Sequence, residues 1–138
     1  MQLTRKLCAS LACSATLLRL CIPSFGDQSA ASVDQITGNV SAIYQSGTAN
    51  TARLEQQAIL GGYANISSIQ QTGDHDSATV SQSGSHDSVS ILQHGDHDTA
   101  TVSQNGSNPT AQVTQWGNYG SVGITQSGGS STSATKQH

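Results

Sequence analysis

The chain has 138 residues, which is enough for one domain of ordinary size, and a formal net charge of −3 at pH 7. Hydrophobic residues make up 34% of it and charged residues only 9%, against roughly 45–50% and about 25% in an average globular domain. This composition argues against an ordinary enzyme scaffold, a coiled coil or a multi-span membrane protein, and leaves either disorder or a fold built on backbone pairing and stacked polar side chains.

A secretory signal peptide is predicted at residues 1–26. Arg5 and Lys6 form a basic start, an apolar stretch follows, and small residues precede a cleavage site after Gly26. The alternative is a retained membrane anchor, which the shortness of the apolar stretch and the presence of Arg19 within it disfavour.

Cleavage of this segment would change both the thiol content and the charge. All three cysteines (Cys8, Cys13 and Cys21) lie within it, so the mature chain should have no disulfide and no cysteine metal site. Arg53 and Lys136 would remain as the only Lys or Arg residues beside eight acids, which gives a net charge of 2 − 8 = −6. Because nucleic-acid binding depends on clustered Lys and Arg, no nucleic acid is predicted as a partner.

After a short segment at 27–34, an eleven-residue repeat is predicted to cover 35–138 as nine half-repeats. Its marker is a glutamine every eleven residues, with one four-residue insertion near 57–60. The glutamines in this series are Gln45, Gln56, Gln71, Gln82, Gln93, Gln104, Gln115, Gln126 and Gln137. Glycines two residues after them are Gly47, Gly73, Gly84, Gly95, Gly106 and Gly117.

Each half-repeat predicts one β-strand and one turn. Ala78, Val80 and Gln82 alternate with Ser and Thr, and this period of two is typical of a strand. The glycines permit positive φ in the turns, where Asp, Asn and Ser are also favoured. One such strand has too few apolar side chains to fold alone, so neighbouring strands must stack at ~4.8 Å.

The predicted fold is therefore all-β: a β-solenoid of 22-residue strand–turn–strand coils that stack into two facing parallel sheets. Stacked glutamines should hydrogen-bond along their own column, because an amide contains both a donor and an acceptor. The aliphatic residues beside them are Ile43, Ile69, Ile91 and Val113 in one sheet, and Leu54, Val80, Val102 and Ile124 in the other. The alternative is a disordered Gln/Ser-rich tract, which has no reason to keep this phase.

The turns carry the chemically suggestive residues, which are Asp76, Asp87, Asp98, His75 and His97. Residues 22 apart should lie over one another, so His75 would sit above His97. Such pairs are conceivable zinc or copper ligands, but we favour charged turns that slow uncontrolled stacking, with no cofactor. Stacked carboxyls favour protonation of one of them, so assembly is predicted to speed up as pH falls towards 5.

The repeat resembles the curlin family, the subunits of the extracellular amyloid fibres called curli. The segment Gln45–Gln56 reads Gln-x-Gly-x-x-Asn-x-Ala-x3-Gln, the core of the curlin repeat, and the segments that begin at Gln71 and Gln93 match it with Asp for Asn. Pro109 replaces that Asn in another unit. The resemblance implies a fibre subunit on the surface of a Gram-negative bacterium, with roles in biofilm and adhesion.

The resemblance also implies partners: further copies of the chain, a second curlin subunit and an outer-membrane secretion apparatus. Both a major subunit and a minor nucleating subunit remain possible. Catalysis is not predicted, because no nucleophile elbow, metal-binding helix motif or phosphate loop is present. The rival function is a soluble monomeric β-solenoid that binds a flat ligand such as ice or a surface, suggested by Thr99 and Thr101, although adjacent half-repeats break that column.

Overall fold

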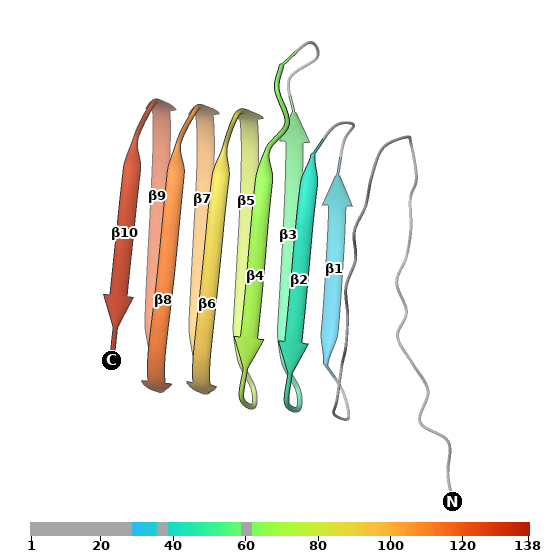
Figure 1. The fold of residues 1–138 in the computed structure, drawn as a ribbon, viewed down its shortest axis with the longest axis vertical. Helices are drawn as coiled ribbons and strands as arrows, with labels where there is room; N and C mark the ends of the chain where they lie inside the picture. Colours follow the sequence, from blue (N-terminus) through green and yellow to red (C-terminus); the bar gives the residue numbers. More distant parts are fainter. Residues whose placement is uncertain (1–28, 36–38, 59–61) are drawn as a thin grey trace, which may run out of the picture.

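The structure is a computed structural model that describes residues 29–35, 39–58 and 62–138. Within these residues it contains ten β-strands and no helix (Figure 1). One sheet holds β1 (Ala30–Gln35), β3 (Thr51–Ala58), β5 (Ser77–Ser85), β7 (Thr99–Ser107) and β9 (Ser121–Gly129), in that order. The other holds β2 (Val40–Ser46), β4 (Ile66–Thr72), β6 (Ser88–Asp96), β8 (Thr110–Asn118) and β10 (Thr132–Gln137).

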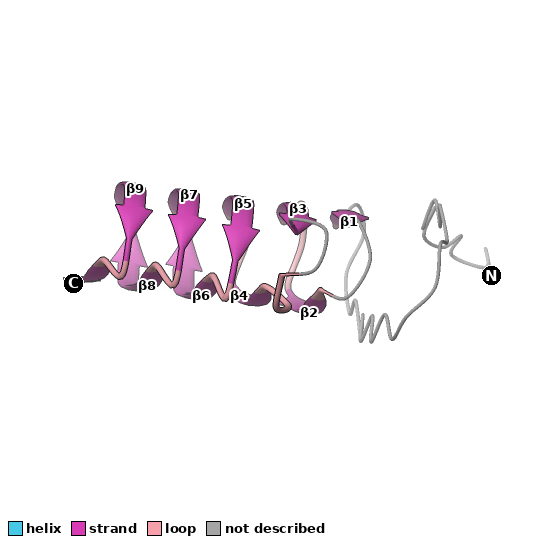
Figure 2. Cartoon of the chain, turned by 90° about the horizontal axis from the view of Figure 1, so that it is seen from above, coloured by secondary structure: helices cyan, strands magenta, loops and turns pink. Residues whose placement is uncertain are grey.

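Successive strands alternate between the two sheets, and every pairing within a sheet is parallel. Seen from above, the chain climbs as a coil with one sheet on either side (Figure 2). From β4 onward each residue pairs with the one 22 positions later, as in Ile69 with Ile91 and Val80 with Val102. This arrangement confirms the predicted β-solenoid of 22-residue coils in two facing parallel sheets.

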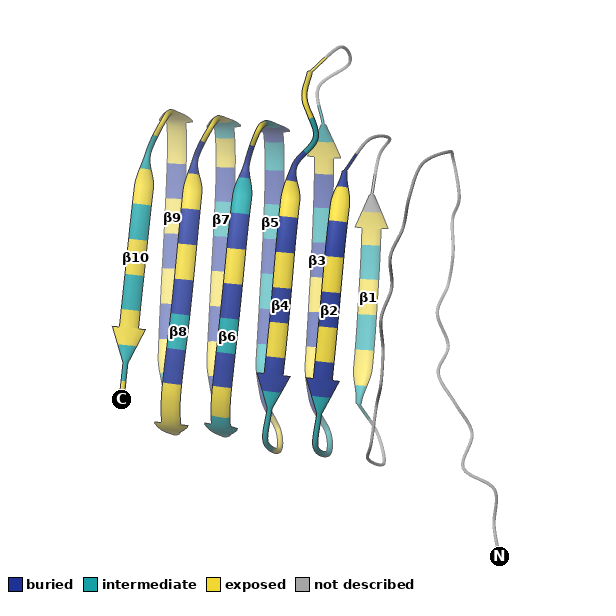
Figure 3. Ribbon diagram, viewed as in Figure 1, coloured by how far each residue is buried: buried dark blue, intermediate teal, exposed yellow. Residues whose placement is uncertain are grey.

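The core is a thin layer between the sheets. Along each strand, buried and exposed residues alternate (Figure 3), as expected where one face is inside and the other in water. In a central strand such as β5, the inner face carries Ala78, Val80 and Gln82, all at most 1% exposed. The outer face carries Ser and Thr. Each strand therefore has little apolar surface of its own, and the fold depends on stacking.

The stack begins earlier than the sequence predicts. β1 lies largely within the segment 27–34 that was expected to precede the repeats, and it pairs in register with β3, so the described residues contain ten strands, one more than the nine predicted half-repeats. Ala31 and Val33 pack against the core. The offset between β1 and β3 is 21 residues, as in Ala30 with Thr51.

The four-residue insertion also lies slightly later than predicted. Gln57 and Ala58 belong to β3 and pair with β5 at an offset of 26, whereas β4 pairs with β6 at 22. The extra 26 − 22 = 4 residues therefore lie between Ala58 and Asn65, partly outside the described residues. The predicted signal peptide at 1–26 is likewise outside them. In the described part of the chain, no helix has the length and apolar character needed to cross a membrane.

Candidate functional site

The glutamines of the even-numbered strands form one continuous column of amide hydrogen bonds. In each pair, Nε2 of the earlier residue donates to Oε1 of the residue on the next strand. The distances are 2.8 Å from Gln45 to Gln71, 3.0 Å from Gln71 to Gln93, 3.0 Å from Gln93 to Gln115 and 3.3 Å from Gln115 to Gln137. The column therefore has one direction, with every donor facing the C-terminal end.

The odd-numbered strands contain a second column with the same direction. Gln56 donates to Gln82 at 2.6 Å, Gln82 to Gln104 at 3.0 Å and Gln104 to Gln126 at 2.7 Å. The side-chain amides also join the two sheets: Gln104 Nε2, for example, donates to the Ser88 carbonyl oxygen at 3.3 Å. Burying an amide costs stability only when it is unpaired, and here the stacking supplies the partners.

The two ends of the columns are not equivalent. At the N-terminal end, Gln45 Oε1 is buried and has no hydrogen-bond partner. At the C-terminal end, Gln126 accepts from Gln104 and donates to the Thr110 carbonyl oxygen, which leaves one of its two amide hydrogens for a further rung. One end therefore offers acceptors and the other offers donors.

Two buried serines extend this network across the core and were missed by the sequence prediction. Ser41 Oγ donates to Gln56 Oε1 at 2.7 Å, and Gln56 Nε2 donates to Ser67 Oγ at 2.8 Å. Ser67 Oγ also donates to Gln82 Oε1. The sequence feature that could have identified them is their place in the repeat: the equivalent residue on the next strand of the same sheet is Val89, an apolar residue that points inward.

The predicted aliphatic columns lie between the sheets. Ile43, Ile69, Ile91 and Val113 stack in the even-numbered sheet, and Leu54, Val80, Val102 and Ile124 stack in the odd-numbered one. All are at most 1% exposed except Ile124, which is 6% exposed on β9 at the edge of its sheet. Their role in assembly, like that of the glutamines, stays a prediction.

The predicted turn glycines, Gly47, Gly73, Gly84, Gly95, Gly106 and Gly117, all have positive φ. They also stack closely: a Cβ placed on Gly95 would lie 1.4 Å from the carbonyl oxygen of Gly117. Gly128, which has φ of +98°, completes the series on β9, and a Cβ placed on it would meet nothing within 4 Å.

The aspartates of the turns are buried rather than exposed. Asp76, Asp87 and Asp98 are each 1% exposed and turn inward at the start of a strand. The Asp98 backbone N–H donates to Asp76 Oδ1 at 3.1 Å, and the Gly120 N–H donates to Asp98 Oδ1 at 2.8 Å. The Asp76 and Asp98 carboxyls therefore act as hydrogen-bond acceptors between rungs.

Burial sets the proton affinity of two of these carboxyls. Burial raises the pKa of Asp76 to about 6, and burial also raises the pKa of Asp87 to about 6. Asp74 has the opposite shift, although it lies on the same turn as Asp76. Hydrogen bonds from the Thr48 backbone N–H and hydroxyl hold the pKa of Asp74 below its usual range.

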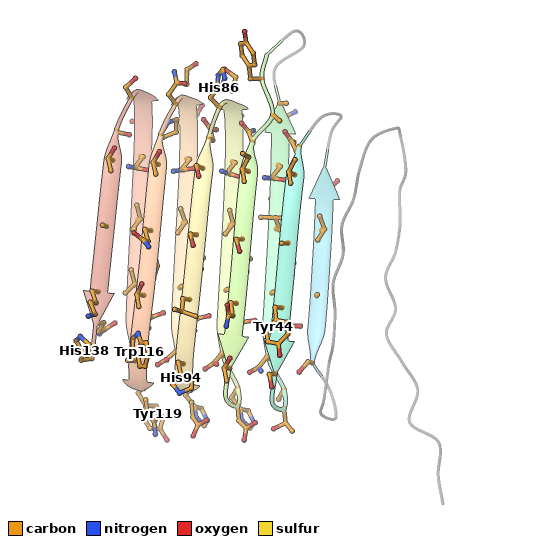
Figure 4. All side chains as sticks on the ribbon, viewed as in Figure 1. Tyr44, His86, His94, Trp116, Tyr119 and His138 are labelled. Atoms are coloured by element: carbon orange, nitrogen blue, oxygen red, sulfur yellow. The ribbon has the colours of Figure 1, made fainter. Side chains whose placement is uncertain are left out.

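The turn histidines lie on the surface in a ring stack. His75 and His97 have ring centroids 4.8 Å apart and planes that differ by 4°, and Tyr119 continues the stack at 4.9 Å from His97. A second ring pair joins His94 and Trp116 at 5.3 Å, near Tyr119 in Figure 4. In the described ranges no group of three or more His, Cys, Asp or Glu residues could hold a metal ion.

The columns give a stability prediction with an internal control. Gln71→Ala removes the acceptor of Gln45 Nε2 and the donor to Gln93 Oε1, and should lower the free energy of unfolding by about 1–3 kcal/mol. Gln70→Ala, on the exposed face of the same strand, should change it by less than about 0.5 kcal/mol. Urea unfolding followed by circular dichroism measures both. Equal effects of the two substitutions would contradict a stabilising role for the column.

Comparison with known proteins gives one match. A family model of the curlin associated repeat matches residues 85–117, which span β6, β7 and most of β8. Searches of curated proteins and of solved structures find no match. The repeat and the β-solenoid fold together fit a structural subunit of the curli type. The chain thus carries a curlin repeat, which confirms over this segment the resemblance to the curlin family that the sequence indicates.

Proposed function

We propose that this chain is a secreted structural subunit of a curli-like extracellular fibre, and that it polymerises by adding copies end to end. The observation that carries the proposal is the single direction of the glutamine columns: the even-numbered column begins with an unpartnered buried acceptor at Gln45, and the odd-numbered column ends with a spare donor at Gln126. A second copy that stacks at the N-terminal end would supply a donor to Gln45, and one that stacks at the C-terminal end would supply an acceptor to Gln126.

The edges of the sheets support the same proposal. Within the described residues, β1 and β2 form one end of the stack and β9 and β10 form the other. At the C-terminal end, Ile124 and Gln126 line an open groove together with Thr135 of β10. A parallel strand laid on an exposed edge gains backbone hydrogen bonds and buries such residues.

The ends differ, so the contact between copies would be heterologous. The donor end of one copy would meet the acceptor end of the next, and a head-to-tail contact along a straight axis does not close into a ring. Growth along the solenoid axis would therefore give an open filament rather than a defined oligomer.

The remaining functional proposals follow from the curlin resemblance. A subunit of this kind would leave the cell after cleavage of 1–26, cross the outer membrane of a Gram-negative bacterium through a secretion apparatus, and join a second curlin subunit on the surface. The fibre would serve in biofilm matrix and adhesion.

The test uses the mature chain, residues 27–138, incubated with and without a second curlin subunit. We expect fibres that bind thioflavin and give a β-sheet circular dichroism spectrum. Fibres from the chain alone indicate a major subunit, and acceleration of the second protein without independent fibres indicates a nucleator. A chain that stays monomeric at high concentration and does neither would contradict the proposal.

A flat-ligand binder is less well supported. The outer face of the odd-numbered sheet does stack Thr79 on Thr101, as an ice-binding face would require. However, Arg53 precedes this pair in the same row and Gly123 follows it. The row is therefore two threonines long in the described part of the chain, and we retain the fibre subunit.

A further inference from the structure

One turn position is built for a side-chain amide. Asn50 occupies it in the turn between β2 and β3, where its Nδ2 donates to the Ser46 carbonyl oxygen at 3.2 Å and to the Gly73 carbonyl oxygen at 2.9 Å. Asn65 occupies the equivalent position on the opposite edge, where its Nδ2 donates to the Gly84 carbonyl oxygen at 3.4 Å. The turn backbone therefore presents carbonyl acceptors to whichever side chain stands here.

Asp76 stands at the same position one coil after Asn50. Its Oδ1 accepts the Asp98 N–H, just as Asn50 Oδ1 accepts the Asp76 N–H at 2.9 Å. Its Oδ2 takes the place of the amide nitrogen, is buried, and has no hydrogen-bond partner. A carboxylate can only accept, so an ionised Asp76 opposes the turn carbonyls, whereas a proton on Oδ2 would supply the missing donor.

Asp87 is in a still less favourable position, one coil after Asn65. The rung that follows it carries Pro109 where the other turns have a backbone N–H. Proline has no N–H to donate, so both Asp87 oxygens are buried without a partner. An unpaired buried charge is strongly disfavoured, and neutralisation by a proton removes most of that cost.

The ionisable groups around both carboxyls are few and mostly acidic. Facing Asp76 are Asp74 and His75 from its own turn and Asp96, His97 and Asp98 from the next. The rung before it presents the neutral Thr48 and Asn50. Near Asp87 are His86 of its own turn and Tyr63, which stacks on His86, together with the neutral Asn65, Asn108 and Pro109.

We propose that Asp76 and Asp87 each take up a proton when the rungs stack, so that acid promotes folding and fibre growth and neutral pH restrains them. The proposal rests on the proposed fibre function only for its assembly readout. This mechanism differs from the charged turns that the sequence predicts to slow stacking by repulsion, because the carboxyls that control assembly here are buried inside the stack.

The pKa shifts agree with this geometry in sign. The pKa of each carboxyl is raised to about 6 in the fold from 3.8 in the unfolded chain, so the associated stability is complete below about pH 4 and is lost as pH rises through 6. For one such group, linkage gives a change of about tenfold in the folding equilibrium between pH 5 and pH 7.5. Two independent groups give about a hundredfold.

The experiment measures the soluble concentration of the mature chain left at the plateau of fibre growth. For a soluble chain that is unfolded and folds as it adds to the fibre, linkage predicts a concentration roughly a hundredfold lower at pH 5 than at pH 7.5. The double variant D76N/D87N should assemble well at pH 7.5, because asparagine supplies the donor, and should lose most of this pH dependence. The control D74N/D96N also removes two acidic side chains, but from the surface of the turns, and should keep the pH dependence.

A wild-type plateau that does not change with pH would overturn the proposal, as would equal pH dependence in the two double variants.

A second measurement does not depend on fibres. Infrared or carbon NMR titration of the folded protein should show two carboxylic acids with midpoints near pH 6 that disappear in D76N/D87N. Pro109→Ala adds a backbone N–H and should lower the midpoint assigned to Asp87. If these titrations are absent, proton uptake by Asp76 and Asp87 is contradicted even if fibres form. If they are present but no fibres form, only the proposed fibre function is contradicted.

Discussion

Gly95→Ala is expected to prevent the mature chain from forming its stack. A Cβ on this residue would lie 1.4 Å from the Gly117 carbonyl oxygen and 2.6 Å from its carbon. The obstacle is backbone, so no side-chain rotation relieves it, and the φ of +154° is itself unsuited to an L residue. The rungs on either side would have to separate, which breaks the ladder at its centre. We expect circular dichroism to show loss of the cooperative unfolding transition.

A matched substitution separates this effect from a general loss of glycine. Gly123 lies on the outer face of β9, where a Cβ would meet nothing within 4 Å. Gly123→Ala should leave the free energy of unfolding within about 0.5 kcal/mol of the parent. If Gly95→Ala unfolds at the same urea concentration as Gly123→Ala, the close approach of the turns is not a feature of the folded protein.

Gly128→Ala is expected to leave the solenoid folded but to stop growth at its C-terminal end. In the chain itself a Cβ here meets nothing within 4 Å, whereas the equivalent Cβ on Gly106 would lie 1.7 Å from the Gly128 carbonyl oxygen. A further copy whose first turn repeated the approach of Gly106 to Gly128 would bring a turn carbonyl to that distance from Ala. The φ of +98° strains an alanine here within the chain, but the steric clash with a neighbouring turn arises only at the contact between copies.

Seeded growth followed by thioflavin fluorescence measures this effect. Gly128→Ala alone should elongate seeds at least about tenfold more slowly than the parent, which corresponds to a barrier increase of about 1.4 kcal/mol. Small amounts of it should also cap parent fibres, because its N-terminal end can still add to them. Gly129→Ala is the control, since its Cβ would meet only the Ser107 carbonyl oxygen at 3.9 Å. Equal elongation rates for these two variants would contradict end-to-end stacking.

The pairing of the strands could be predicted because like residues recur 22 positions apart and pair best with one another. Ile69 with Ile91 and Gln82 with Gln104 follow directly from that period. β1 was missed because the spacing changes there: Gln35 precedes Gln45 by ten residues rather than eleven, and its strand pairs at an offset of 21. A repeat sought at one fixed period does not detect a unit that is one residue short.

The environment of the candidate site residues was harder to predict than their positions. Asp76 and Asp98 stack as expected, but polar turn residues are usually exposed, and only the geometry of this turn shows that they point inward. Likewise, Ser41 and Ser67 suit an exposed strand face by composition, yet they bond to Gln56 across the core. Which face a hydroxyl occupies depends on the strand's register, and a period of two leaves both faces available to serine.

The central claim, that each molecule supplies all the rungs of its own stack, is tested most directly by a single spin label within fibres. Ser90 is exposed on β6, and the mature chain should have no other thiol in a Ser90→Cys variant. Each sheet has five strands in the described part of each molecule, so labels on neighbouring copies should lie about 24 Å apart at ~4.8 Å per rung. Electron paramagnetic resonance should then show dipolar coupling at that distance. Exchange-narrowed spectra from labels stacked about 5 Å apart would mean that each rung pairs with its own copy in the next molecule, and would contradict the solenoid.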